Sequence, residues 1–297
     1  MSDQLIPIVC IVGAGRSGTN FLARSLGHDN QFRNLGENRY IWNHGQKFLR
    51  TDRRNTKEAT TETREFIRSH FQGIHGSCGK MLIDKTPGNA LRLEFVKAIL
   101  PEAKIINIIR DGRACVYSRK MLWEGDVNRK PVDFPIKRYL HQFFLMQRNG
   151  NIPIRRLPTF LADNMAHYVS GLLLRRPILA GERMPGLREI AKVDGMMRAR
   201  AFQWRETVLA AVSCGRRLGS EHYLEIRLED MLVKPDEIFR QIYEFLGLDY
   251  SHAPANHISE RSDLGRQSVW FSGLDDSTRQ DLEDMLAPDL RFLGYVE

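Results

Sequence analysis

The stretch Ile8 to Leu22, IVCIVGAGRSGTNFL, combines a glycine-rich loop with an arginine, a serine and a threonine. An apolar, β-branched segment precedes the glycines and a helical pattern follows them. A strand, a glycine turn and the start of a helix bring free backbone N–H groups and the helix dipole to one place, which favours binding of an anion. The sequence therefore predicts a site for a phosphate-like group at this loop.

The loop differs from the nucleotide-binding pattern G-x-x-x-x-G-K-[ST] in the position of its cation. Gly13 and Gly18 have the spacing of that pattern and Thr19 supplies a hydroxyl, but no lysine precedes the threonine. The cation is Arg16, inside the loop. Its charge lies away from a β/γ-phosphate and nearer to a bridging oxygen, so we expect the bound group not to be a triphosphate.

A second set of anion-binding residues follows the run Lys104–Ile109, which is apolar on both sides of the pleat, as in a central parallel strand. Arg110 comes directly after this run, at the end of the strand where open α/β sheets bind ligands. Ser118 follows two turns into the next helix, on a face that can approach the same place. A guanidinium matches phosphate oxygens bidentately. Two such sites on neighbouring strands predict a ligand with two separated anionic groups.

Alternating strands and helices must position these residues. Apolar strand-like runs occur at Pro7–Val12, Lys80–Ile83, Lys104–Ile109 and His222–Ile226, and helical patterns at Thr19–Gly27, Ala59–Phe71, Asn89–Leu100, Gly112–Trp123, Met196–Leu218 and Asp236–Leu246. This alternation predicts an α/β fold with a central parallel sheet covered by helices on both faces.

The length of 297 residues and the hydrophobic content of 42% favour one domain over residues 1–297. Between residues 124 and 195 the pattern changes to helical segments rich in Leu, Met and Arg and broken by prolines. We interpret this stretch as a helical insertion within the domain that covers the active face and selects the substrate.

The net charge of +8 indicates an anionic partner. The arginine doublets are dispersed and no nucleic-acid motif accompanies them, so we expect no nucleic acid. A polyanionic small substrate or peripheral contact with an acidic membrane surface fits the charge better. No apolar run approaches the roughly 18 residues that span a membrane. The N-terminus is acidic where a signal peptide is basic, and the four scattered cysteines are typical of reduced thiols, so a cytoplasmic location is expected.

Four motifs together resemble a known family. GRSGTNFL, DKTPGN, IIRDGRACVYS and RLEDMLVKP, which begin at residues 15, 84, 108 and 227, occur in the order found in sulfotransferases that use 3′-phosphoadenosine 5′-phosphosulfate (PAPS). The resemblance is strongest to the tyrosylprotein-type and related bacterial members, and it covers residues 5–123 and 200–297. It implies a P-loop-like sulfotransferase fold with a helical insertion. It also implies PAPS as co-substrate, adenosine 3′,5′-bisphosphate as product, and no metal.

The resemblance assigns roles to individual residues. The 5′-phosphosulfate would be wrapped by Gly15, Arg16, Ser17, Gly18, Thr19 and Asn20, and the 3′-phosphate held by Arg110 and Ser118. Arg16 would stabilise the charge that grows on the bridging oxygen during an in-line displacement, and Lys85 would be the second cation at the transferred group.

The segment Gly36-Glu37-Asn38-Arg39 resembles the family element G-E-x-(x)-R, whose glutamate is the general base, with a spacing one residue shorter than in the tyrosylprotein enzymes. Glu37 is therefore the candidate base. Other family members use a histidine; His28, His44 and His75 stand in no comparable motif, and we interpret them as structural or surface residues.

Further positions are assigned in the same way. Leu228 replaces a common adenine-contacting tyrosine, so the adenine would pack against an aliphatic face, and Arg266 lies where the family often places another 3′-phosphate ligand. Structural roles are expected for Glu229, Asp230, Trp204 and Trp270, and Arg113 is expected to pair with Asp111.

The sequence thus indicates a sulfotransferase that acts on a hydroxyl or amine acceptor. Two alternatives remain: a nucleotide kinase or NTPase with Asp84 as magnesium ligand, and a non-catalytic anion-binding protein. The acceptor stays open among small molecules, glycans, lipid-linked glycans and peptides, as does the oligomeric state.

Overall fold

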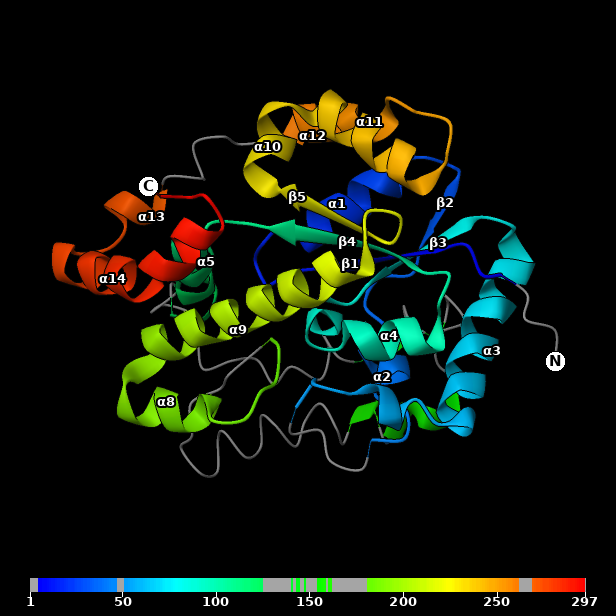
Figure 1. Cartoon of the computed structure of the whole chain (residues 1–297), viewed down its shortest axis with the longest axis horizontal. Coiled ribbons are helices and arrows are strands. Elements are labelled where there is room, and N and C mark those ends of the chain that lie inside the picture. The colour runs from blue at the N-terminus through cyan, green and yellow to red at the C-terminus, as the bar shows by residue number, and fades with distance from the viewer. Residues whose placement is uncertain are drawn as a thin grey trace.

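A five-stranded sheet forms the centre of the molecule in the computed structural model (Figure 1). Its strands are β1 (Ile8–Val12), β2 (Phe32–Asn34), β3 (Met81–Lys85), β4 (Lys104–Ile109) and β5 (Tyr223–Arg227), arranged in the order β2-β3-β1-β4-β5. Every neighbouring pair is parallel, so all five carboxyl ends meet at one edge. The structure describes residues 5–46, 51–124, 140, 143–144, 147, 154–158, 160–161, 181–261 and 269–296.

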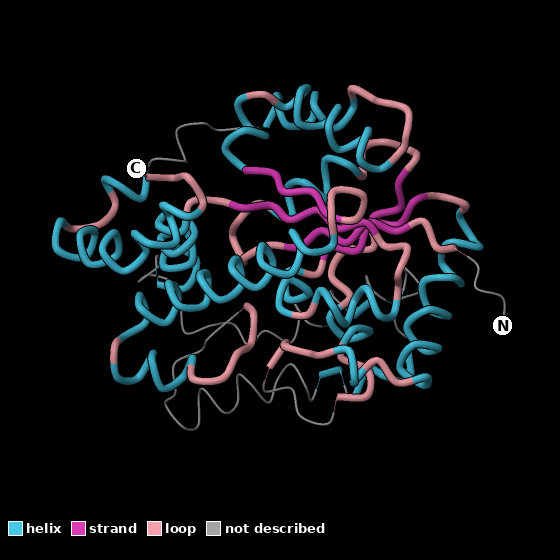
Figure 2. Tube along the Cα trace, in the orientation of Figure 1, coloured by secondary structure: helices cyan, strands magenta, loops and turns pink. Residues whose placement is uncertain are grey.

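Helices cover both faces of the sheet, as Figure 2 shows. One face packs against α1 (Thr19–Leu26), α11 (Pro235–Leu246) and α12 (Ala253–Arg261), the other against α3 (Thr61–Cys78), α4 (Leu93–Ile99) and α9 (Gly195–Leu218). Successive side chains of a strand point to opposite faces. All five residues of β1 are buried. Val9 and Ile11 pack in the core beneath α1, α11 and α12, and Ile8, Cys10 and Val12 pack in the core beneath α3, α4 and α9. The predicted fold class is confirmed.

A third apolar cluster lies beside the carboxyl edge of the sheet. It joins α5 (Gly112–Glu124) and α9 to α13 (Val269–Ser272) and α14 (Asp276–Phe292). The other elements are α2 (Arg39–Trp42), α8 (Leu187–Val193), α10 (Leu228–Val233) and the 3₁₀ turns η1 (Thr56–Glu58), η2 (Pro87–Leu91) and η3 (Ile154–Arg156).

Two predicted helices need correction. The helix predicted at Asn89–Leu100 is instead η2 followed by α4, and they are separated at Arg92, whose backbone is not helical (φ −148°). The helix predicted at Ala59–Phe71 starts at Thr61, after a Thr60 N-cap, and continues to Cys78. The predicted strand Lys104–Ile109 agrees with β4, whereas the short strand β2 was not predicted.

The proposed insertion at residues 124–195 lies largely outside the described residues, and Arg266 lies outside them as well. Among the described residues, none of the helices has the length and apolar character needed to cross a membrane.

Candidate functional site

The glycine loop after β1 has the strained backbone of a ligand-binding turn. Arg16 is the one non-glycine residue with positive φ (76°) in the part of the chain that the structure describes. Such a conformation costs energy in an ordinary residue and is concentrated at functional sites. Gly18 (φ 96°) starts α1, and a Cβ there would lie only 2.7 Å from Leu228 Cδ1. The loop therefore packs tightly against Leu228 at the start of α10.

The two predicted phosphate sites meet at Arg16. Its Nε donates to Ser118 Oγ (3.0 Å), and its carbonyl accepts from Arg110 Nη1 (3.1 Å). Burial lowers the pKa of the Arg16 guanidinium, and the cations Arg110 and Arg119 lower it further. Three guanidinium groups thus crowd around the loop, an arrangement that favours an anionic ligand.

A buried hydroxyl in the loop also fits a bound anion. Ser17 is fully buried, and its Oγ has no hydrogen-bond partner among the described residues. Buried hydroxyls are nearly always hydrogen-bonded, so a missing partner requires an explanation. An oxygen of a phosphate or sulfate group in the loop would be such a partner.

Lys85 and Glu37 form a second pair at the same sheet edge. Lys85 ends β3, where it is aligned with Ile11 of β1, and its backbone N–H donates to the Gly36 carbonyl (3.0 Å). Its Nζ lies 3.2 Å from Glu37 Oε2. The Lys85 side chain is buried, whereas that of Glu37 is 33% exposed and can be reached from solvent.

The ionisation of Glu37 is set by opposing effects. Burial raises the pKa of its carboxyl, but the Lys85 ammonium and the Arg39 guanidinium outweigh burial and hold the pKa below its ordinary value. Glu37 is therefore ionised at neutral pH, as a proton acceptor must be.

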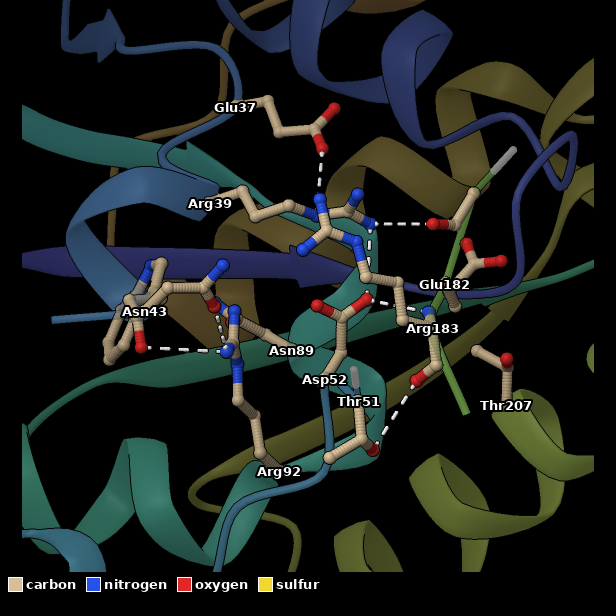
Figure 3. A network of polar contacts seen from close by, with 12 residues as sticks. Glu37, Arg39, Asn43, Thr51, Asp52, Asn89, Arg92, Glu182, Arg183 and Thr207 are labelled. Atoms are coloured by element: carbon tan, nitrogen blue, oxygen red, sulfur yellow. Dashed lines mark hydrogen bonds and ion pairs between the residues drawn. The ribbon is translucent and has the colours of Figure 1, made fainter. Parts of the chain in front are cut away.

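Arg39 links Glu37 to a buried polar network that the sequence did not predict (Figure 3). Its Nε lies 3.7 Å from Glu37 Oε1, and its Nη2 lies 3.2 Å from Asp52 Oδ2 and donates to the Gly181 carbonyl (3.0 Å). Asp52 also accepts from the backbone N–H of Arg183 (2.8 Å).

Arg119 connects the glycine loop to the same segment, residues 181–183. Its Nε donates to the Gly15 carbonyl (3.3 Å) and its Nη2 lies 2.6 Å from Glu182 Oε2. Gln203 of α9 bonds both Arg119 and the Glu182 carbonyl. No local motif marks the three residues of this network that the sequence does not predict, Asp52, Arg119 and Glu182. Their partners are remote in the chain: Arg119 and Glu182 are 63 residues apart, and Asp52 and Arg183 are 131 residues apart.

Asp84 has a structural role, because it joins several segments through hydrogen bonds. It is fully buried and accepts hydrogen bonds from Asn38 (2.8 Å), Trp42 (2.8 Å), Thr86 (2.9 Å) and Asn89 (3.1 Å). With four donors on its two oxygens, it has no free position for a cation. A magnesium ion at Asp84 would have to displace one of these donors, so the arrangement argues against the alternative that made Asp84 a magnesium ligand.

The structural roles expected for several neighbours agree with the structure. Arg113 pairs with Asp111 (2.7 Å), and Glu229 accepts from the Asp111 N–H (3.1 Å). Trp204 is buried and donates to the Arg110 carbonyl (3.2 Å), and Trp270 is buried under the Arg113 guanidinium. Trp204 thus also fixes the backbone of a predicted ligand residue.

The three histidines considered as alternative bases make contacts of other kinds. His28 stacks on His257 and His44 on Phe66, and the His75 ring bonds the carbonyl of Lys80 just before β3 begins. Glu37 is the candidate that the structure places beside Lys85.

The parallel sheet and the glycine loop after the first strand place the chain among α/β proteins with a P-loop-like fold. Residues 7–150 match the model of the sulfotransferase family, which confirms the resemblance read from the motifs. No curated protein sequence matches the chain.

Solved structures show the same fold. A sulfotransferase from Alicyclobacillus acidocaldarius is 14% identical, with a TM-score of 0.53 over 98% of this chain and 94% of that one. Sulfotransferase STF9 from Mycobacterium avium is 14% identical, with a TM-score of 0.53 over 97% of this chain and 77% of that one. The family match and the fold together support sulfotransfer activity.

Proposed function

We propose that the protein transfers a sulfuryl group from PAPS to a hydroxyl or amine acceptor. The observation that carries this proposal is that Arg16 of the glycine loop contacts both Arg110 and Ser118. In the same loop, the buried Ser17 hydroxyl has no protein partner in the described part of the chain. Two anion sites that share Arg16 suit a nucleotide with separate 3′ and 5′ charges, and a triphosphate less well.

The donor site uses the residues after β1, β4 and β5. The loop residues Gly15 to Asn20 would hold the 5′ side through backbone N–H groups and the Ser17 hydroxyl. Arg110 and Ser118 would hold the 3′-phosphate, with Arg266 as a further ligand, and Leu228 would pack against the adenine. When bound, PAPS supplies a sulfuryl group that is already activated for transfer.

The transfer is an in-line displacement. A bond forms between the acceptor oxygen or nitrogen and sulfur while the bond from sulfur to the bridging oxygen breaks. Lys85 and Arg16 stabilise the charge that develops on the transferred group and the bridging oxygen. Glu37 accepts the proton of the acceptor at a carboxylate oxygen.

The proposal includes a cytoplasmic location and transfer without a metal ion. We place the reaction in the cytoplasm, because each of the four cysteines is unpaired. The positive side chains take the role that magnesium has with triphosphates, so we propose transfer without a divalent metal. The acceptor is a small molecule, a glycan, a lipid-linked glycan or a peptide, with no nucleic acid involved; peripheral membrane contact is compatible with the net charge of +8.

The test compares thermal unfolding with adenosine 3′,5′-bisphosphate, AMP and ATP, with and without magnesium. We expect the bisphosphate to stabilise the protein without metal, by about 2.7 kcal/mol at a hundredfold excess over its Kd. Arg110→Gln should abolish this effect. As control, the same change at exposed Arg24, near the end of α1, should leave it intact. Stabilisation by magnesium-ATP in preference to the bisphosphate would refute the proposal.

A further inference from the structure

Arg39 is shared unequally between two carboxylates. Its Nη2 lies 3.2 Å from Asp52 Oδ2, whereas its Nε lies 3.7 Å from Glu37 Oε1. The shorter pair is also the more deeply buried one: the Asp52 side chain is 1% exposed and that of Glu37 33%. The guanidinium is thus held mainly by Asp52, and it approaches Glu37 without a close hydrogen bond.

Asp52 is itself fixed in place by backbone bonds. Its Oδ2 accepts from the Arg183 N–H (2.8 Å), and its own N–H donates to the Arg183 carbonyl (2.9 Å). The Gly181 carbonyl accepts from the same Arg39 nitrogen that faces Asp52. Two acceptors therefore hold Nη2, and one of them, Asp52, lies on the other side of Arg39 from Glu37 (Figure 3).

We propose that Asp52 is a positioning residue for Glu37: it anchors Arg39 on the segment 181–183 and so prevents the guanidinium from closing on the Glu37 carboxylate. An arginine released from Asp52 could bind Glu37 through two parallel N–H···O bonds, the strongest geometry for such a pair. A carboxylate occupied in this way is a poorer proton acceptor and is turned away from the acceptor substrate. The inference relies on the proposed function only for the role of Glu37.

Among the described residues, the charges that act most strongly on Glu37 come from separate elements. They include Lys85 at the end of β3, Arg39 in α2 and Asp52 in the loop before η1. Glu182 acts in turn on Arg39, and Arg183 on Asp52. Lys85 and Arg39 lower the pKa of Glu37, and Asp52 raises it. Removal of the Asp52 charge should therefore lower that pKa twice over, by loss of a neighbouring anion and by closer approach of Arg39.

The test is a ¹³C NMR titration of the full-length protein labelled at glutamate side-chain carboxyls, with the Glu37 signal assigned from its absence in Glu37→Gln. We expect the Glu37 midpoint to fall to lower pH in Asp52→Asn than in the wild type. Asp289→Asn is the matched control, because Asp289 is a buried carboxylate 3.2 Å from Arg205 on other elements. This control should leave the Glu37 midpoint unchanged.

Sulfuryl transfer gives a second readout. PAPS turnover with a panel of phenol, sugar and amine acceptors should fall about tenfold to a hundredfold in Asp52→Asn, as for a small misplacement of a reacting group. Stabilisation by adenosine 3′,5′-bisphosphate should persist. An unchanged Glu37 midpoint in folded Asp52→Asn would overturn the inference.

If Asp52→Asn does not fold, Arg39→Gln serves as the second variant. This change removes the cation and leaves an amide at the position. Here the Glu37 midpoint should rise, and a midpoint equal to that of the wild type would equally overturn the inference. Failure of the bisphosphate to bind the wild-type protein would instead count against the proposed function, since the titration does not depend on the nucleotide.

Discussion

Glu37 combines the two properties that a catalytic carboxylate needs. Lys85 and Arg39 keep its pKa below the ordinary value, so it is ionised at neutral pH. Its side chain nevertheless remains one-third exposed, at 33%, so an acceptor group can reach it. The Lys85 Nζ lies 3.2 Å away, so a cation stands directly beside the proposed base.

The change Glu37→Gln tests this role, because it keeps the shape of the side chain and removes the base. The rate of sulfuryl transfer should fall by about 10² to 10⁴, the usual contribution of a general base. The thermal stabilisation by adenosine 3′,5′-bisphosphate should stay at the wild-type level, since Glu37 lies outside the Arg16–Ser118–Arg110 cluster. PAPS turnover and thermal unfolding measure the two effects, and a variant with undiminished turnover would exclude Glu37 as the base.

Residues within a motif could be predicted from the sequence, and residues that act through the tertiary structure could not. The offset between Arg110 and Ser118 is visible because it follows helical spacing after a strand, and Arg16 indeed contacts both. Asp52 and Glu182 have no such signature. Their partners come from remote parts of the chain, and a single acidic residue in a polar stretch is typical of exposed surface.

At the scale of elements, each strand brings one group of site residues to the same edge. β1 leads to the glycine loop, β2 to Glu37, β3 ends in Lys85, β4 leads to Arg110 and β5 to Leu228. The long apolar strands could be predicted from their sequence, since burial on both faces requires an unbroken apolar run. β2 has only three residues, one of them exposed, and so carries no such pattern.

The segment 181–183 connects these strand ends to the helices behind them, and the Arg119–Glu182 pair is its tightest link. The two side chains are 6% and 2% exposed, so Glu182→Gln removes a buried carboxylate from beside the Arg119 cation. The free energy of unfolding should fall by about 3 kcal/mol. Because Arg119 also holds the Gly15 carbonyl, the bisphosphate should bind more weakly as well.

Urea unfolding and calorimetric titration with the bisphosphate measure these two losses. Glu94→Gln provides the control: Glu94 pairs with Arg217 at 2.8 Å, but the side chains are 55% and 63% exposed. Exposed pairs contribute about 1 kcal/mol or less. Equal losses in the two variants would show that the buried pair does not hold the loop.

At the scale of the whole molecule, the class of fold can be predicted from the order of apolar runs and glycine loops. The packing of residues 181–183 against the glycine loop cannot be predicted in this way. A parallel sheet needs helices on both faces whatever their sequence, so β-α alternation suffices to predict it. The return of residues 181–183 onto the loop depends on buried ion pairs and backbone bonds, which no hydrophobic period encodes. The selection of the substrate by residues 124–195 therefore stays a prediction.

The stability of the whole fold should depend on pH through His70, on the inner side of α3. Its ring meets Phe71 edge-on (5.2 Å), and burial lowers its pKa from 6.5 to about 4. Between these two values the unfolded chain binds a proton that the folded chain does not, so the free energy of unfolding rises with pH across this window. One such group contributes at most about 1.4 kcal/mol per pH unit.

Urea unfolding of wild type and His70→Gln at intervals from pH 4 to pH 7 measures this contribution. The wild-type protein should lose stability steadily as the pH falls from about 6.5 toward about 4, because the unfolded state gains the proton. The variant should lose less over the same range, since glutamine does not titrate. Carboxyls with lowered pKa, such as Asp52, destabilise the fold only at the acid end and act alike in both proteins. Parallel stability curves for the two proteins would show that His70 is protonated in the folded state and that its burial is looser than the packing on Phe71 indicates.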